Sequence, residues 1–275
     1  MTKTWFITGT SSGLGRILAE QVLARGDRVA ATLRKPGVLD ALKAEHGDRL
    51  WVERLDVTDT SEVRRVVGKA FSDLGRIDVV VSNAGYGLFG AAEELSDEQI
   101  RSQLETNLVG SIQLIRAVLP HLRGQGGGRI LQVSSEGGQI AYPNFSLYHA
   151  TKWGIEGFVE AVSQEVAPFG IEFTLVEPGP TRTGFAEGIV QPPALAIYDR
   201  TPSGDIRRAL KEGAFPIKGD ALKCVQAMLE SVSHSPAPKR LVLGRTAYAS
   251  IRAALASRLS ALDAQKELAV AADAD

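Results

Sequence analysis

A tyrosine and a lysine stand four residues apart in the segment YHATK, as Tyr148 and Lys152. In a helix, residues with this spacing lie on the same face, so the lysine ammonium would lie near the phenol. A free phenol has a pKa of about 10 and is a poor acid–base at neutral pH, but a nearby ammonium lowers that pKa. The pair therefore predicts proton exchange with a carbonyl oxygen, although the motif alone is by default a surface pair.

Two further polar residues stand at compatible places. Ser135 ends a predicted strand at 128–135, thirteen residues before Tyr148, and its hydroxyl could hold a substrate oxygen. Asn107 falls within a long helix predicted from Ser96, where a capping box with Gln99 begins it, towards Leu122. A buried asparagine there could anchor a chain of water molecules or simply pack between helices.

Neighbouring residues predict less chemistry. His149 points about 100° round the helix from Tyr148, so packing or surface exposure is expected. Glu136 is interpreted either as a pocket residue or as a solvated loop carboxylate. The four histidines are scattered and no metal site is predicted. The absence of a G-x-S-x-G motif argues against an α/β-hydrolase.

A glycine-rich segment, TGTSSGLG, follows the first predicted strand and places glycines at Gly9, Gly13 and Gly15. Glycines there allow a tight turn, close approach to a pyrophosphate and close packing of the next helix. The N–H groups and positive dipole of that helix N-terminus would face the phosphates. The spacing differs from G-x-G-x-x-G, and a structural turn is the alternative.

Strands and helices are predicted to alternate, which would place these residues at one edge of a sheet. Buried strands are expected at 4–8, 28–33, 50–57, 77–85, 128–135, 171–179 and 240–244. Helices are expected at about 14–24 and about 147–167, and another helix should begin at a capping box of Asp59 with Glu62. Their continuous apolar runs are typical of parallel strands covered on both faces. The pattern predicts a Rossmann-type, doubly wound, mainly parallel seven-stranded sheet.

The composition predicts one ordinary globular domain at 1–263, followed by a tail at 264–275 that is expected to be partly disordered. A net charge of −1 argues against nucleic acid and anionic membrane as partners. No apolar stretch is long enough to span a membrane, and no signal peptide is recognised, so a cytoplasmic location is expected. Cys224, the only cysteine, is expected to be structural.

Taken in order, TGTSSGLG, NAG, Asn107, Ser135, YxxxK and PGPTRT resemble the short-chain dehydrogenase/reductase family from about Lys3 to Thr183. The resemblance implies a catalytic tetrad of Asn107, Ser135, Tyr148 and Lys152. Tyr148 would exchange the proton, Lys152 would lower its pKa and hold the nicotinamide ribose, Ser135 would orient the carbonyl, and Asn107 would support a water relay.

The resemblance also implies a nicotinamide cofactor, and the end of the second strand favours NADP(H). Leu33 stands where NAD-preferring members usually carry an acid, and Arg34 follows where NADP-preferring members often carry a base. The adenine is expected near Asp56 and Val57. The remaining expected cofactor contacts are Gly9, Ser11, Ser12, Gly13, Leu14, Gly15, Asn83, Ala84, Gly85, Tyr148, Lys152, Pro178, Gly179, Thr181 and Thr183.

These features predict an NADP(H)-dependent carbonyl reductase or alcohol dehydrogenase acting on a small molecule with an apolar face. A lid at 183–215 is expected to cover that substrate, and the helices at about 96–122 and 147–167 to pair in a homodimer or homotetramer. Two alternatives are a nucleotide-sugar epimerase or dehydratase, for which the chain is short, and a redox sensor without turnover. Such sensors typically lose the tyrosine or the lysine, and this chain keeps both.

Overall fold

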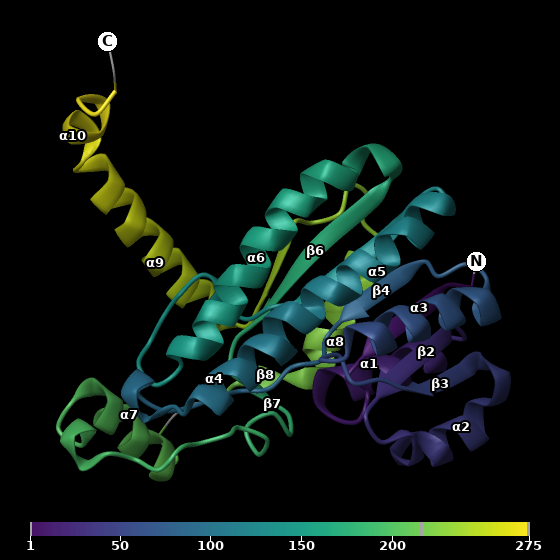
Figure 1. Ribbon diagram of the computed structural model, residues 1–275, viewed down its shortest axis with the longest axis horizontal. Coiled ribbons are helices and arrows are strands. Elements are labelled where there is room, and N and C mark those ends of the chain that lie inside the picture. Colours follow the sequence, from purple (N-terminus) through teal and green to yellow (C-terminus); the bar gives the residue numbers. More distant parts are fainter. Residues whose placement is uncertain (1, 215–216, 274–275) are drawn as a thin grey trace.

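A seven-stranded parallel sheet forms the centre of the molecule in the computed structural model, which describes residues 2–214 and 217–273 (Figure 1). Its strand order is β3-β2-β1-β4-β5-β6-β9. The strands are β1 (Thr4–Thr8), β2 (Arg28–Leu33), β3 (Leu50–Arg54), β4 (Val79–Ser82), β5 (Gly128–Val133), β6 (Ile171–Pro178) and β9 (Arg240–Leu243). The order reverses between β1 and β4, as in a doubly wound fold, which confirms the predicted fold class.

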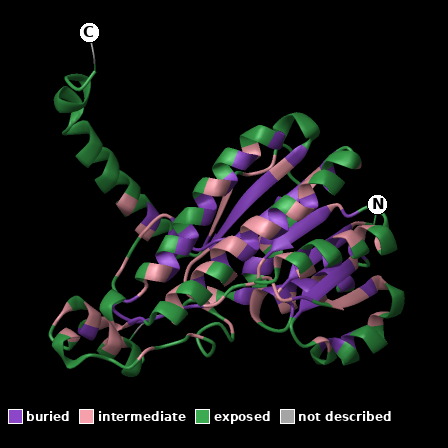
Figure 2. Cartoon of the chain, in the orientation of Figure 1, coloured by how far each residue is buried: buried purple, intermediate pink, exposed green. Residues whose placement is uncertain are grey.

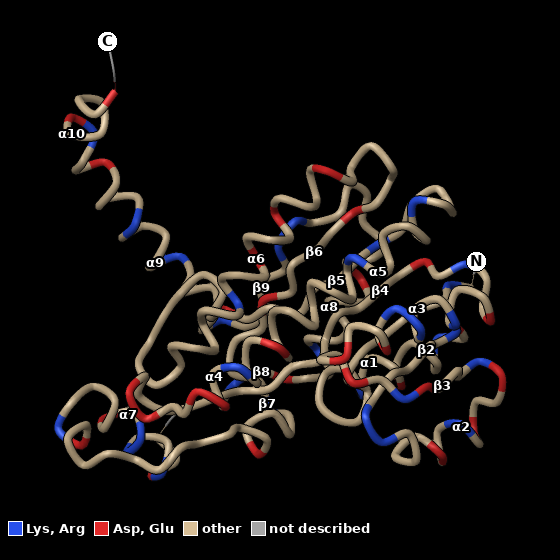
Figure 3. The backbone as a smooth tube through the Cα atoms, in the orientation of Figure 1, with Lys and Arg blue, Asp and Glu red and all other residues tan. Residues whose placement is uncertain are grey.

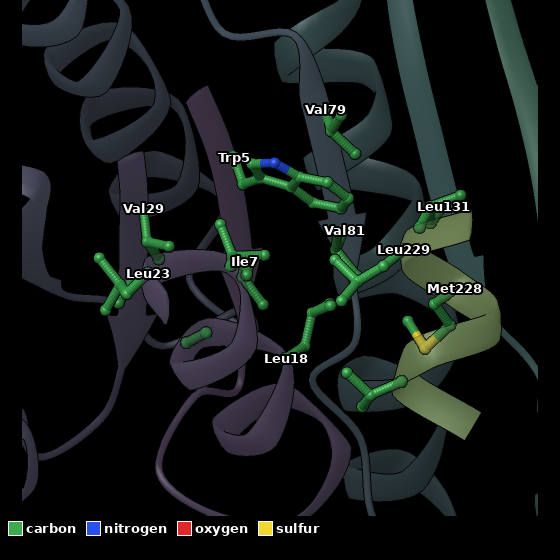
Figure 4. Close-up of a cluster of buried hydrophobic side chains, with 14 of the residues drawn as sticks. Trp5, Ile7, Leu18, Leu23, Val29, Val79, Val81, Leu131, Met228 and Leu229 are labelled. Atoms are coloured by element: carbon green, nitrogen blue, oxygen red, sulfur yellow. The ribbon is translucent and has the colours of Figure 1, made fainter. Parts of the chain in front are cut away.

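Helices cover both faces of the sheet (Figure 2), and the inner strands β1 and β4 are buried at every residue, whereas the edge strands β3 and β9 are mostly half-buried. In β1, Trp5 and Ile7 contribute to one apolar cluster and Phe6 to the other. The first cluster lies against α1 (Gly13–Ala24), α2 (Asp40–His46) and α8 (Ala221–Ser231), and Figure 4 shows Leu18, Leu23, Met228 and Leu229 within it. The second packs against α3 (Thr60–Leu74), α5 (Gly110–Gly124) and α6 (Ser146–Val166).

Five strands are shorter than the sequence predicts, and β3 and β4 differ most. β3 ends at Arg54 rather than residue 57, and β4 spans Val79–Ser82 rather than 77–85. The capping box predicted at Asp59 is only half correct. Asp59 accepts from the N–H groups of the first turn of α3, but Glu62 accepts instead from the N–H of Asp56 at 2.8 Å.

The chain between β6 and α8 leaves the sheet as an excursion with its own short elements. It begins at β7 (Thr181–Arg182), which pairs with β8 (Gly219–Asp220), and it contains η7 (Ala196–Tyr198) and α7 (Pro202–Lys211). Phe215, the last residue of the predicted lid, lies outside the described residues. Most of the excursion is exposed (Figure 2).

The C-terminal helix α9 (Arg245–Asp263) follows β9 and leads away from the body, and α10 (Lys266–Val270) continues it (Figure 1). Disorder was expected over 264–275, yet the structure describes a helix within that tail, and residues 274–275 lie outside the described part. Cys224 lies buried on α8, as expected of a structural cysteine.

Acidic and basic residues are interspersed over the whole fold (Figure 3). Within residues 2–214 and 217–273, no helix combines the length and apolar character needed to cross a membrane.

Candidate active site

A cavity of about 460 Å³ opens at the carboxyl ends of the strands, where the strand order reverses. Open α/β sheets bind ligands at this place, because the loops of neighbouring strands diverge there. Sixteen of the predicted site residues line it: Gly9, Ser11, Ser12, Gly13, Leu14, Arg34, Asn83, Ala84, Gly85, Ser135, Tyr148, Lys152, Pro178, Gly179, Thr181 and Thr183. Segments that are up to about 170 residues apart in the sequence thus form one wall.

Four predicted site residues are absent from the cavity lining, within the part of the chain that is described: Gly15, Asp56, Val57 and Asn107. Asp56 accepts hydrogen bonds from the N–H and hydroxyl of Thr58 at 3.0 and 2.8 Å. Val57 packs beneath Gly110, where a Cβ would meet its carbonyl oxygen at 2.9 Å. The sequence places these residues near the site but does not reveal which way they face.

The glycine turn has the close contacts that its composition predicts. Gly9 has a φ of +72°, and a Cβ there would lie 2.9 Å from Cα of Ala84. At Gly15 a Cβ would lie 2.4 Å from the Gly9 carbonyl oxygen, so only glycine lets α1 pack against the turn. Asn83 donates to the carbonyls of Thr8 and Gly9 at 2.9 and 3.2 Å and thereby joins the end of β4 to the turn.

The N-terminus of α1 is suited to an anion. Its N-cap, Ser12, makes no side-chain capping hydrogen bond, and no acidic residue lies in the first turn. The N–H groups of that turn and the positive end of the helix dipole are therefore available on the cavity wall, which Ser11, Ser12 and Gly13 line.

Tyr148 and Lys152 lie on one face of α6 and are both buried, at 8% and 7% exposed. The lysine Nζ lies 5.6 Å from the tyrosine ring centroid and donates to the Val133 carbonyl oxygen at 3.0 Å. Ser135 lies two residues beyond the end of β5, close enough to the Tyr148 phenol that its hydroxyl contributes to lowering the phenol pKa. A surface pair, the default interpretation of this spacing, is therefore wrong.

Burial controls the protonation of this pair. It raises the pKa of Tyr148 to about 12, against a smaller lowering by the Ser135 hydrogen bond. It also lowers the pKa of Lys152 to about 8, and the Glu156 carboxylate opposes this shift. The expected lowering of the phenol pKa is therefore not found. Burial destabilises the phenolate by more than its neighbours stabilise it. At neutral pH Tyr148 holds its proton and Lys152 is charged.

Asn107 lies in a π-helical turn, η4 (Glu105–Val109), between α4 (Asp97–Leu104) and α5. Single π turns inside helices occur often at functional sites. Its Oδ1 accepts from the N–H of Tyr86 at 3.0 Å, and its Nδ2 donates to the Tyr86 carbonyl at 2.8 Å. Both bonds hold the loop after β4, and a Cβ on Gly85 would lie 3.1 Å from the same Oδ1.

Aromatic and aliphatic side chains from distant segments form the rest of the cavity wall. Phe145 lies between Phe89 and Tyr148, with ring centroids 5.0 and 5.8 Å away, and Phe185 approaches Tyr148 at 6.0 Å. From the excursion come Ile189, Ile206, Leu210 and Ile217. Within the predicted lid, Phe185 and Ile189 line the cavity, whereas Ile197 is 78% exposed.

Glu136 and His149 are buried rather than solvated. The His149 ring connects two backbone groups. Its Nδ1 lies 2.9 Å from the Gly137 carbonyl oxygen, and its Nε2 accepts from the N–H of Tyr142 at 3.2 Å. Of the two roles expected for His149, packing and surface exposure, its burial fits packing. The interpretation of Glu136 as a solvated loop carboxylate is wrong, because its side chain lines the cavity and burial raises its pKa.

A buried ionic network that sequence reasoning missed lies behind the site. Arg240 of β9 pairs with Glu156 of α6 and Glu177 of β6. Glu156 also accepts from the hydroxyl of Ser134 at 2.5 Å, and Glu177 accepts from Gln139 at 2.6 Å. One guanidinium thus connects two strands, the turn after β5 and the helix that carries Tyr148. No local pattern could reveal this network, because its members are far apart in the sequence.

The residues that follow β2 and β3 determine the charge in the part of the cavity that Arg34 lines. Leu33 is buried in the core, whereas Arg34 is exposed and lines the cavity. Asp56 lies near enough to Arg34 that the guanidinium contributes to lowering the aspartate pKa, although burial alone would raise it. Within the described residues, no group of three or more His, Cys, Asp and Glu side chains could hold a metal ion.

The family model for short chain dehydrogenases matches residues 3–193. The chain therefore belongs to this family of oxidoreductases. It is 40% identical to "Oxidoreductase BOA17" of Botryotinia fuckeliana over 245 residues, which is 89% of each chain. It is also 39% identical to the 3-ketodihydrosphingosine reductase of Bacteroides thetaiotaomicron over 181 residues, covering 66% of this chain and 65% of the relative.

Solved structures share the fold over almost the whole chain. A short-chain dehydrogenase from Streptomyces avermitilis superposes with a TM-score of 0.91 at 35% identity, covering 99% of this chain and 100% of that one. A short chain dehydrogenase from Burkholderia cenocepacia, solved in complex with NADP, has a TM-score of 0.74 at 26% identity, covering 96% and 97%. One from Burkholderia phymatum, solved with NAD, has a TM-score of 0.78 at 22% identity and shows the fold alone.

Proposed function

We propose that this protein is an NADP(H)-dependent reductase of carbonyl compounds, with Tyr148 as the proton donor. The observation that carries this proposal is the meeting of a buried, protonated Tyr148, Ser135 and Lys152 with the glycine turn and Arg34 in one cavity. Each group alone has ordinary structural explanations. Their common position at the strand ends favours hydride chemistry on a carbonyl carbon.

The residues present fit a dinucleotide phosphate. A Cβ at Gly9 would fill the turn, and the uncapped N-terminus of α1 offers N–H groups to a pyrophosphate. The Arg34 guanidinium is suited to a 2′-phosphate, whereas an acidic residue there would favour NAD. When bound, the nicotinamide would supply or receive the hydride.

The protein's own groups would handle the substrate oxygen and the proton. The Ser135 hydroxyl would donate to the carbonyl oxygen and orient it, and Tyr148 would transfer its phenolic proton to that oxygen as it becomes an alkoxide. The charged Lys152 would stabilise the phenolate that remains. Burial raises the pKa of Tyr148 to about 12, so the phenol holds the proton that it would donate in the reduction.

NADPH oxidation measured with a panel of aldehydes and ketones tests this function. Tyr148→Phe removes the donor but keeps the ring, so turnover should fall by about 10²–10⁴-fold while NADPH affinity stays near wild type. Ser135→Ala should lower kcat with the fold intact. Wild-type turnover in the Tyr148 variant would refute the mechanism, and NADPH binding without turnover of any substrate would favour the redox-sensor alternative.

We further propose that the protein works as a homodimer or homotetramer on a small carbonyl or alcohol substrate with an apolar face. A cytoplasmic location also stays a prediction. The epimerase or dehydratase alternative has less support, because the described chain builds its site from one sheet and a single excursion.

A further inference from the structure

A second carboxyl group lies in the cavity, and the reduction chemistry makes no use of it. Glu136 directly follows Ser135 and begins the short turn η5 (Glu136–Gly138). Glu136 is only 5% exposed, yet it lines the cavity together with Tyr142 and Tyr148. A carboxyl group removed from water is costly unless it is hydrogen bonded, so its position needs a physical reason.

The Glu136 Oε2 atom is fully buried and has no hydrogen-bond partner among the described residues. Neighbouring side chains are engaged elsewhere. Gln139 donates to Glu177 at 2.6 Å, and the hydroxyl of Ser134 donates to Glu156 at 2.5 Å. The His149 Nδ1 lies 2.9 Å from the Gly137 carbonyl oxygen. Ser134, Gln139 and His149 thus donate elsewhere, and no described side chain donates to the Glu136 Oε2 atom, although the phenols of Tyr142 and Tyr148 line the same cavity.

The cavity wall combines polar and apolar side chains around the proposed site of reduction. Ser135, Glu136, Tyr142 and Tyr148 carry polar groups. The excursion adds the apolar side chains of Phe185, Ile189, Ile206, Leu210 and Ile217, and the Phe185 ring centroid lies 6.0 Å from that of Tyr148. A ligand that satisfies both kinds of group carries a hydrogen-bond donor near its reacting carbonyl and an apolar tail.

We propose that Glu136 determines substrate specificity by accepting a hydrogen bond from a donor group that the substrate carries next to its carbonyl. The substrate class is then an amphiphilic hydroxy ketone or amino ketone with an alkyl or aryl tail. This inference rests on the proposed reductase function, since it names the substrate of the same site. A site built to bind a substrate hydroxyl or amine discriminates strongly against the analogue without it, because the buried acceptor stays unpaired.

Three matched substrates test this inference: a medium-chain methyl ketone, the same ketone with a hydroxyl on the methyl carbon, and the same ketone with an amine there. The wild-type kcat/KM should be at least about tenfold higher for the two donor-bearing ketones. Glu136→Ala should remove this preference. Glu136→Gln, which keeps the shape and one acceptor oxygen, should retain the preference for the hydroxyl and lose that for the amine. Glu187→Gln, at an exposed carboxylate of the excursion, is the matched control and should leave all three values unchanged.

A binding experiment separates this inference from the reductase proposal. Calorimetric titration of the protein saturated with NADPH, in which an alcohol cannot react, compares the diol and the mono-alcohol that correspond to the hydroxy ketone and the plain ketone. Tighter binding of the diol to wild type, lost in Glu136→Ala, supports the role of Glu136 even without turnover. Equal affinities for both alcohols, or equal kcat/KM for all three ketones, would overturn it while leaving the reductase function intact. Absence of NADPH and NADH oxidation with every ketone would instead refute the reductase function.

Discussion

The side chain of Asn107 forms two hydrogen bonds with the backbone of Tyr86, one through each of its amide atoms. Gln103 donates to the same Tyr86 carbonyl at 3.1 Å, so that oxygen has a second donor, whereas the Tyr86 N–H depends on Asn107. This arrangement connects the π turn with the loop that carries Gly85 into the cavity.

Asn107→Leu should therefore destabilise the fold as well as the site. Loss of the acceptor leaves one half-buried N–H unpaired, which typically costs about 1–3 kcal/mol in the free energy of unfolding. Urea denaturation followed by circular dichroism measures this change. Gln113→Leu, on the half-exposed side of α5, is the control. An unchanged denaturation midpoint in the Asn107 variant would show that the two bonds contribute nothing to stability.

Arg34 should set the preference for NADPH over NADH. We expect kcat/KM to favour NADPH by more than about tenfold, which corresponds to roughly 1.4 kcal/mol of differential binding. Arg34→Ala should reduce this ratio, because the guanidinium lines the cavity. The neighbouring Lys35 is exposed and is not part of the cavity lining, so Lys35→Ala should keep the ratio. A wild-type enzyme that favours NADH would contradict the interpretation of this loop.

The alkaline limit of the reductase activity should follow Lys152. Burial lowers the pKa of this lysine to about 8, and the Glu156 carboxylate counteracts the shift. Glu156→Gln removes that negative charge, so the pKa of Lys152 should fall further and activity should be lost at a lower pH than in wild type. The measurement is kcat/KM against pH. Glu160→Gln, which also pairs with Arg240 but at an exposed position, should leave the profile in place. Identical profiles for all three proteins would exclude Glu156 as the group that keeps Lys152 charged.

Glu94 should hold the excursion over the cavity. Its carboxylate accepts from the N–H groups of Leu195 and Ala91 at 2.8 and 2.7 Å, and it pairs with Arg207 of α7. Glu94→Gln should increase hydrogen exchange over residues 183–211 and raise KM more than it lowers kcat. Glu93→Gln, at the contact with the Tyr198 hydroxyl, is the control for a more exposed bond. Core-like protection of the excursion in the Glu94 variant would contradict a mobile lid.

The same contact predicts a pH dependence. Burial alone would raise the pKa of Glu94, but the two backbone hydrogen bonds and Arg207 together lower it. A lowered folded-state pKa gives stabilisation that is complete above the ordinary glutamate pKa and is lost as pH falls through the folded value. Protection of the excursion should therefore decrease in acid, below the usual carboxyl range. An acid-insensitive exchange pattern in wild type would show that this carboxylate does not hold the lid.

Self-association should use the outer faces of α4, α5 and α6. Ile112 and Phe158 are only half-buried there, and Trp153 is 44% exposed. Phe158→Arg should shift the sedimentation coefficient towards that of a monomer at micromolar concentration, because it places a charge in an apolar contact. Leu262→Arg, on the exposed face of α9, distinguishes this interface from one made by the C-terminal helix. A wild-type protein that sediments only as a monomer would refute the prediction.

The sequence by itself determined the fold class and most of the site wall. Continuous apolar runs identified the seven strands because parallel strands must be buried on both faces. The glycine turn was recognisable because two of its positions require glycine. Gly9 has a positive φ, and a Cβ on Gly15 would lie only 2.4 Å from the Gly9 carbonyl oxygen. Tyr148 and Lys152 could be placed together because helical spacing is also local.

Only the tertiary structure decided which of these groups are desolvated and what they contact. Burial, not the lysine charge, dominates the pKa of Tyr148, and the phenol pKa rises where the sequence predicted a fall. Glu136 is not a solvated loop carboxylate but a buried acceptor without a partner, because its turn packs against α6, β6 and α9. Arg240 meets Glu156 and Glu177 across 84 and 63 residues. Desolvation and long-range pairing depend on which segments pack together, and no local spacing contains that information.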